Sequence, residues 1–207
     1  GATSYPCAPF SVAYRVGTTP AEVAVDAAIE RFAALRRGFS LYVRTGVDAD
    51  MERECRARGF LECGIMPVMA LDCADVENGR VSGIRLDPVE SPQRVAEFAE
   101  IASRAYLTAD VPASVVKEAF NSPHDVLQSP ARLYIASHHD EVVGCGLLLP
   151  AANVVGIYWV SVLPQHRCRG YATAMTQRLV QIAKASGMQT VVLQALSPAD
   201  RIYRSLH

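Results

Sequence analysis

The sequence has 207 residues, 50% of them hydrophobic, with 20 Lys and Arg against 21 Asp and Glu. This length and apolar content predict one large domain, or one domain with an appendage, and exclude a wholly disordered chain. The formal net charge of -1 leaves no basic field for a phosphate backbone, which argues against nucleic acid as the main partner.

The six cysteines are scattered without a CxxC pair, so the sequence indicates neither a zinc site nor a disulfide framework. We interpret them as thiols of a cytoplasmic protein, since no basic and then apolar segment predicts a signal peptide. The uncharged stretch 142–164 is long enough to cross a bilayer, but Pro150 and Asn153 interrupt it. Its β-branched and aromatic residues predict two strands joined by a turn, so we expect no membrane span.

The first 80 residues predict a small α/β segment. Residues 1–17 carry no periodic pattern, and Thr19 with Pro20 is typical of a helix start. The elements expected next are a strand, a short polar helix and an extended segment, at 39–46, 48–58 and 60–71. The polar, turn-rich stretch 72–83 predicts a domain boundary near residue 80, which gives domains 1–80 and 81–207.

The second part predicts an α+β domain. Ser91 followed by Pro92 is a strong helix start, and the apolar spacing carries this helix to Tyr106. The other helices are expected at 112–120, 171–186 and from 197 onward, and the strands at 84–89, 132–137, 141–149, 154–163 and 189–195. A right-handed crossover through the helix that starts at Tyr171 makes the last two strands parallel.

The stretch 167–172, Arg-Cys-Arg-Gly-Tyr-Ala, lies where an apolar strand gives way to this helix. The first N–H groups of a helix have no backbone partner, and the helix dipole adds positive charge there. Gly170 lets the backbone approach a ligand, while Arg167 and Arg169 add full charges. On the physics alone, an anion site and a solvated basic turn are equally good interpretations.

The same residues fit the pattern [Q/R]-x-x-G-x-[G/A], and no other window of the chain does. With the strand before it and the helix after it, this loop resembles the pyrophosphate loop of the GNAT superfamily of acyl-CoA N-acyltransferases. A later strand followed by "RIYRSL" is similar to the family's late helix with its tyrosine, here Tyr203. The resemblance covers 81–207 and implies a central, mostly antiparallel sheet with one splayed parallel strand pair, flanked by helices.

The resemblance also implies a binding mode for acetyl-CoA as co-substrate, with no metal. The pantetheine arm would pair with the backbone of Trp159, Val160, Ser161 and Val162 as if it were another strand. The pyrophosphate would be held by the N–H groups of Arg167, Cys168, Arg169, Gly170, Tyr171, Ala172 and Thr173. Family members usually have glycine at the place of Cys168, a departure that bears on the conformation of the loop.

By the same resemblance, Tyr203 is the general acid that protonates the leaving thiolate. A core tyrosine on an amphipathic helix is the other interpretation. No base is identified: Asp110, Glu118 and His138 could act through water, but each is more typical of a surface residue. The histidines in loops, His124, His138 and His139, lack the spacing of metal ligands.

Two functions remain open. The first is an acetyl-CoA-dependent N-acetyltransferase acting on a primary amine of a small molecule or peptide. The second is a non-catalytic GNAT-fold module that binds acyl-CoA as a sensor or partner. The intact loop and Tyr203 favour the enzyme.

We also interpret residues 1–80 as a degenerate half-copy of the same fold, in which Cys55 falls at the place of Tyr203. The chain stops where family members continue into a closing strand, so strand 189–195 is expected to lack its usual neighbour. We predict that residues 60–71 cover this edge, from the same chain or from the second chain of a homodimer. The alternative is a natural protein that continues past His207.

Overall fold

The computed structural model describes residues 11–75, 83–107 and 112–194. The chain divides into two compact units, Gly1–Gly64 and Ile65–His207, which we call the N-terminal and C-terminal units. The division falls earlier than the boundary expected near residue 80, because the strand at 68–72 belongs to the sheet of the C-terminal unit. The last predicted helix, from residue 197, lies outside the described residues.

The N-terminal unit contains two strands and two helices. They are β1 (Val12–Tyr14), α1 (Ala21–Ala34), β2 (Ser40–Tyr42) and α2 (Ala49–Ala57). The two strands pair in parallel, and Val25, Met51 and Cys55 form the buried core between the helices. The sequence did not predict β1, since three residues are too few for a periodic pattern. The expected cap was also wrong: Pro20 occupies the N-cap of α1 and no side chain caps the helix.

A cluster of charged side chains closes this unit. Asp48, 3% exposed, precedes α2 and accepts hydrogen bonds of 2.8 Å from both Arg15 and Arg44. Arg15 also pairs with Asp50. These hydrogen bonds, first from Arg44 and then from Arg15, hold the pKa of Asp48 well below its ordinary value. The cluster therefore joins the strand end of β1 to the start of α2 as long as Asp48 is charged.

The C-terminal unit is built on a six-stranded sheet in the order β3-β8-β7-β6-β5-β4. The strands are β3 (Val68–Asp72), β4 (Ile84–Pro88), β5 (Arg132–His138), β6 (Glu141–Ala151), β7 (Val154–Val162) and β8 (Thr190–Gln194). All neighbours are antiparallel except β7 and β8, which are parallel. This is the α+β architecture that the sequence predicts, and the apolar stretch 142–164 forms β6 and β7.

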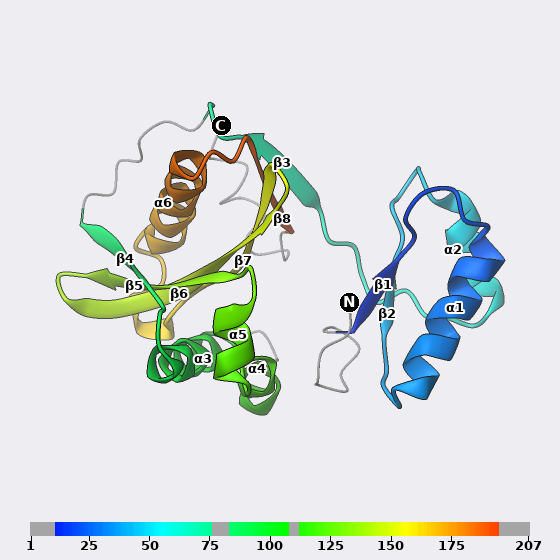
Figure 1. Cartoon of the computed structure of the whole chain (residues 1–207), viewed down its shortest axis with the longest axis horizontal. Coiled ribbons are helices and arrows are strands. Elements are labelled where there is room, and N and C mark those ends of the chain that lie inside the picture. Colours follow the sequence, from blue (N-terminus) through cyan, green and yellow to red (C-terminus); the bar gives the residue numbers. More distant parts are fainter. Residues whose placement is uncertain (1–10, 76–82, 108–111, 195–207) are drawn as a thin grey trace. The chain divides into compact units, whose positions relative to one another are not determined.

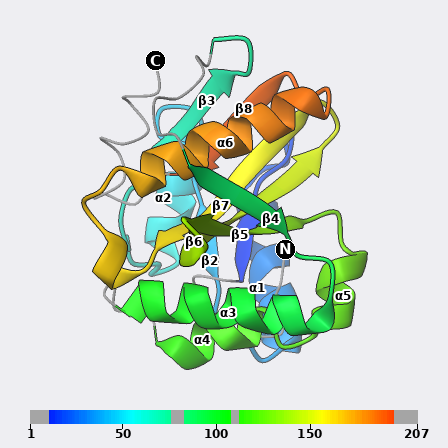
Figure 2. The same ribbon diagram turned by 90° about the vertical axis from the view of Figure 1, so that its left-hand side faces the viewer.

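Helices cover both faces of this sheet, as Figures 1 and 2 show. One face carries α6 (Tyr171–Ala185), and the other carries α3 (Pro92–Tyr106), α4 (Ala113–Ala119) and the short α5 (Pro123–Gln128). The predicted cap of α3 is confirmed, since the Ser91 hydroxyl accepts a hydrogen bond from the Arg94 N–H. No helix in the described part of the chain is long and apolar enough to cross a membrane.

The outer edge of β8 is covered by β3 of the same chain. The two strands are antiparallel over five residue pairs, from Val68 opposite Gln194 to Asp72 opposite Thr190. Figure 1 shows β3 beside β8 at the border of the sheet. The predicted pairing of strand 189–195 with residues 60–71 is thus confirmed in its single-chain form, and it buries Leu71.

Candidate functional site

The two parallel strands at the centre of the sheet stay paired over only part of their length. β7 and β8 pair from Val154 opposite Thr190 to Ile157 opposite Leu193. β7 continues for five more residues, Tyr158–Val162, of which Tyr158, Ser161 and Val162 are in register with β6 on the other side. Among the residues that the structure describes, no strand faces this part of β7 on the side of β8.

A bulge marks the point where the pairing ends. Between Cys145 and Leu147 of β6 the facing strand advances from Ser161 to Tyr158, so β7 has one extra residue. Trp159 lies in the bulge with φ of +56°, a conformation that non-glycine residues rarely adopt. Such a conformation at one residue of a central strand is typical of a functional site.

The bulge places two consecutive aromatic side chains on one face of the sheet. Residues directly opposite in an antiparallel pair point to the same face, so Tyr158 lies on the side of Leu147, toward α3. Trp159 also packs against this side, with its ring 5.3 Å from that of Tyr106 and 5.1 Å from that of Phe120. Sequence reasoning had no signal for the role of Tyr106, which ends a helix far away in the chain.

The loop after β7 forms a backbone cradle. A 3-10 turn at Pro164–His166 leads to Cys168 and Gly170, whose φ angles of +58° and +79° are both left-handed. Cys168 thus adopts the conformation in which glycine is favoured, although it carries a side chain.

The first N–H groups of α6 face outward from this loop without a partner. The first hydrogen bond of the helix runs from the Ala174 N–H to the Gly170 carbonyl, and no side chain caps the end. The N–H groups of Tyr171, Ala172 and Thr173 therefore have no acceptor among the described residues. Three free donors and the positive end of a 15-residue helix are suited to a phosphate group.

The two arginines of the loop have different surroundings. Arg167 donates to the main-chain oxygen of Val162 from Nε and to that of Ala105 from Nη2, at 3.2 and 2.7 Å. Its guanidinium is thus engaged in holding the loop to β7 and to the last turn of α3. Arg169 is exposed and has no ion-pair or hydrogen-bond partner in the described residues, so its charge is free for an anion.

Tyr171, the first residue of α6, fixes the other side of the loop. Its hydroxyl shares a hydrogen bond of 3.1 Å with Nδ1 of His138, at the end of β5. The ring of His166 lies 6.3 Å from that of Tyr171. The helix start is thereby tied to the β5–β6 turn, which keeps the free N–H groups in a defined place.

The residues considered for acid–base chemistry are not brought together. Tyr203 and Asp110 lie outside the described residues, so the role of Tyr203 stays a prediction. Glu118 accepts a hydrogen bond from the side chain of Asn121, and His138 bonds Tyr171. Neither carries the geometry of a base next to the bulge.

A buried thiol lies beside the bulge, but it is a poor nucleophile. Cys145 on β6 is 0% exposed, and its Sγ lies 3.1 Å from the hydroxyl of Ser161. Burial raises the pKa of Cys145 to about 12, so the thiol stays protonated at neutral pH. A protonated thiol is a poor nucleophile, which leaves Cys145 as a packing residue.

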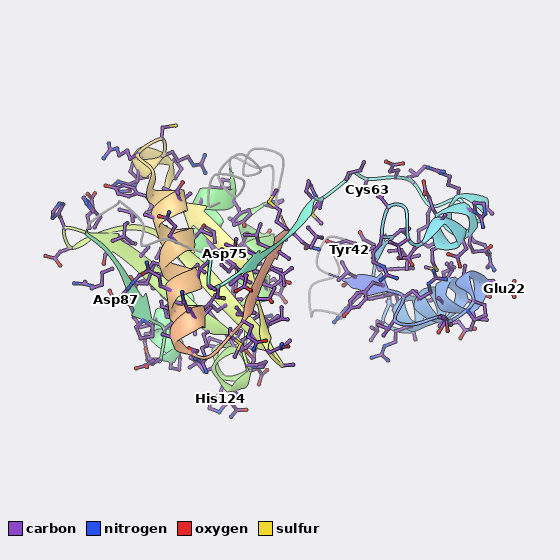
Figure 3. All side chains as sticks on the ribbon, turned by 90° about the horizontal axis from the view of Figure 1, so that it is seen from above. Glu22, Tyr42, Cys63, Asp75, Asp87 and His124 are labelled. Carbon is purple, nitrogen blue, oxygen red and sulfur yellow. The ribbon has the colours of Figure 1, made fainter. Side chains whose placement is uncertain are left out.

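The three histidines considered as metal ligands do not form one cluster: the rings of His138 and His139 lie 4.1 Å apart, whereas His124 lies on another element. His124 lies on α5, which precedes β5 in the sequence, and Figure 3 shows it on the outer side of the helix. His138 and His139 follow at the far end of that strand. Within the described residues, no group of three His, Cys, Asp or Glu side chains is placed to hold a metal ion.

Comparison with known proteins agrees with this geometry. Residues 95–207, more than half of the chain, match the acetyltransferase (GNAT) family. No protein of curated function matches the sequence.

Solved structures share the fold over almost the whole chain. A GCN5-related N-acetyltransferase from Kribbella flavida has a TM-score of 0.74 at 21% identity, covering 98% of this chain and 79% of that one. A functionally unknown conserved protein from Staphylococcus epidermidis has a TM-score of 0.63 at 15% identity, covering 94% of this chain and 78% of that one. A GCN5-related N-acetyltransferase from Sphaerobacter thermophilus has a TM-score of 0.60 at 20% identity, covering 89% of this chain and 62% of that one. At these sequence identities the similarity shows only that the fold is shared.

Proposed function

The chain belongs to the acetyltransferase (GNAT) family, and from this premise we propose that it moves an acetyl group from acetyl-CoA to a primary amine of a small molecule or peptide. The observation that carries the proposal is the position of the free helix start just after β7, beyond the part of that strand that pairs with β8. A ligand with a pyrophosphate at one end and an extended amide arm fits this arrangement.

Each part of acetyl-CoA has a candidate partner. The N–H groups of 168–173 would bind the pyrophosphate, whereas that of Arg167, also expected to do so, donates to the Pro164 carbonyl. The exposed charge of Arg169 would add to the binding. The backbone of 159–162 would pair with the two amides of the pantetheine arm. Since the arm runs from the loop back along β7, the thioester would lie next to the bulge at Trp159.

The reaction follows from this placement. The amine nitrogen forms a bond to the thioester carbonyl carbon, the C–S bond breaks, and the thiolate of CoA leaves with the electron pair. The proton that the nitrogen loses passes to water or to a base, and Tyr203 would supply a proton to the thiolate. The high pKa of Cys145 favours direct attack, because a protonated thiol would not form an acyl-enzyme.

Release of free thiol from acetyl-CoA in the presence of a panel of amines tests the proposal. We expect saturable turnover with at least one primary amine, and none with the corresponding tertiary amine. Stabilisation of the protein by acetyl-CoA without turnover on any amine would favour the second function, a module that binds acyl-CoA.

A further inference from the structure

The loop before α6 contains a buried histidine whose side chain is not satisfied. His166, the last residue of the 3-10 turn, is 4% exposed. Its Nε2 atom has no hydrogen-bond partner among the described residues, although buried side-chain nitrogens almost always have one. This atom lies 3.4 Å from Oε1 of Glu141, the first residue of β6. A buried polar atom without a partner costs free energy, which indicates a role for His166 beyond packing.

The protonation state of His166 decides whether Nε2 is satisfied. A neutral imidazole has one nitrogen that donates and one that accepts, and an accepting Nε2 cannot bond a carboxylate. An imidazolium donates from both nitrogens, so its Nε2–H would form a charge-assisted hydrogen bond to Glu141. The Glu141 side chain is 70% exposed and has room to close the gap to the roughly 2.8 Å of such a bond. The pair is therefore suited to bind a proton at His166.

The other charged or titratable side chains around this pair are engaged elsewhere or exposed. The engaged ones are Tyr171 with His138, His139 with His138, Asp140 with Arg85, and Arg167 with the main-chain oxygens of Val162 and Ala105. Arg169 of the loop and Arg104 at the end of α3 are exposed. Within the described ranges, Glu141 is thus the one carboxylate that faces the imidazole of His166.

His166 directly precedes the residues that would hold the pyrophosphate. Arg167 follows it, and the N–H groups from Cys168 to Thr173 come next in the chain. The His166 ring also lies 6.3 Å from that of Tyr171, the first residue of α6. A pyrophosphate in the loop therefore brings negative charge close to this imidazole, and the burial of His166 limits the screening by water. Nearby negative charge favours the charged form of a histidine.

We propose that His166 takes up a proton when acetyl-CoA binds, and that its imidazolium, paired with Glu141, stabilises the bound pyrophosphate. This inference rests on the proposed acetyl-CoA site and adds a residue that supplies charge to it. Because protonation and binding favour each other, the affinity for the ligand rises as the pH falls through the range in which histidine titrates, from about 8 to 6. The gain ends at the pH where His166 is already charged in the free protein.

Calorimetric titration of dephospho-CoA between about pH 5.5 and pH 8.5 tests the proposal. This ligand keeps the pyrophosphate and the pantetheine arm but lacks the 3′-phosphate, whose second proton ionises at about pH 6 and would mask the effect. We expect the wild-type affinity to rise on the order of 5–10-fold from pH 8 to pH 6. The binding enthalpy in two buffers of different ionisation enthalpy gives the proton uptake, which should pass through a maximum in this range.

Two variants and a control make the test specific. His166→Gln cannot be charged, so its affinity for dephospho-CoA should vary less than about 2-fold over the same pH range. Glu141→Gln keeps the imidazole but removes its carboxylate, which should move the rise in affinity to lower pH. His139→Gln removes an exposed histidine of the neighbouring turn and should retain the wild-type pH dependence.

The outcomes separate this inference from the proposed function. A pH dependence that persists in a folded His166→Gln protein would overturn the role of His166, and so would a pH-independent wild type that binds the ligand. If His166→Gln does not fold, Glu141→Gln decides, and an unshifted pH range in that variant would contradict the proposal. Proton-linked binding without thiol release on any amine would support His166 and contradict catalysis. Absence of binding of both dephospho-CoA and acetyl-CoA would overturn the acetyl-CoA site, and this inference with it.

Discussion

Arg167 donates a hydrogen bond of 2.7 Å to the main-chain oxygen of Ala105, which joins the loop before α6 to the last turn of α3. A second bond from Arg167 reaches the oxygen of Val162 at the end of β7. One guanidinium thus holds together the three elements around the proposed acetyl-CoA site. A basic side chain also fits the carbonyl oxygens at a helix end.

Replacement of the two loop arginines should therefore give different results. Arg167→Ala is expected to lower the stability of the unliganded protein by about 1 kcal/mol, since two carbonyl oxygens lose a charged donor. It should also weaken acetyl-CoA binding on the order of 10-fold, because the loop loses its anchor. Thermal unfolding and calorimetric titration measure the two effects.

Arg169→Ala is the matched comparison. Arg169 is exposed and has no partner in the described residues, so its loss should leave unliganded stability unchanged. Acetyl-CoA affinity should still fall about 3–10-fold at low salt, and less at high salt, where exposed charges are screened. Equal losses of unliganded stability in the two variants would show that Arg167 is not the anchor.

Cys168 has a left-handed backbone conformation, with φ of +58°, so replacement of this residue should change the stability of the loop. For a non-glycine residue this conformation costs roughly 1–2 kcal/mol. Cys168→Gly should remove the strain and give a melting temperature at or above that of wild type, with acetyl-CoA affinity retained. Cys168→Val, whose branched side chain tolerates this conformation poorly, should lower both. A stable, tightly binding Val variant would refute the strained conformation.

The charged cluster of the N-terminal unit should make α2 sensitive to acid. The pKa of Asp48 is held below its ordinary value by hydrogen bonds from Arg44 and Arg15, so its stabilising effect is complete above an ordinary carboxyl pKa of roughly 4. It is lost as the pH falls below that value toward the lower folded-state pKa. The protection factors of the α2 amides, taken relative to intrinsic exchange at the same pH, should therefore fall on acidification more in wild type than in Asp48→Asn. An equal fall of the protection factors in both proteins would contradict this assignment.

Tyr203 lies outside the described residues, and its role rests on the family resemblance. Tyr203→Phe removes only a hydroxyl. If Tyr203 protonates the leaving thiolate, kcat should fall on the order of 10²-fold or more while acetyl-CoA affinity is unchanged. Wild-type turnover in this variant would return Tyr203 to the interpretation as a core residue.

The features predicted correctly from sequence depend on local physics. Ser91 caps α3 through its own hydroxyl, and the helix expected directly after Gly170 begins at Tyr171. The pairing of β3 with β8, by contrast, is not local; its prediction came from the family resemblance, which implies a further strand beside 189–195, and from the need to cover an apolar edge.

The features that sequence did not reveal depend on contacts between distant residues. The bulge at Trp159 arises from the register of β7 against β6, which no local pattern encodes. Arg15 meets Asp48 across 33 positions of the chain. The same reason explains the domain boundary, which lies after Gly64 and not near residue 80. β3 pairs with β8 and so belongs to the sheet of the C-terminal unit.

The central claim, that the loop before α6 holds acetyl-CoA by its backbone, is tested most directly by calorimetric titration of acetyl-CoA into Gly170→Glu. A matched control is Gly187→Glu, the same change after the other end of α6, where φ is +82° and a side chain meets open space. Both changes strain the backbone similarly, but only the first puts a negative side chain at the free N–H groups. We predict that Gly170→Glu abolishes measurable binding and that Gly187→Glu retains it. Wild-type affinity in a folded Gly170→Glu protein would contradict the account.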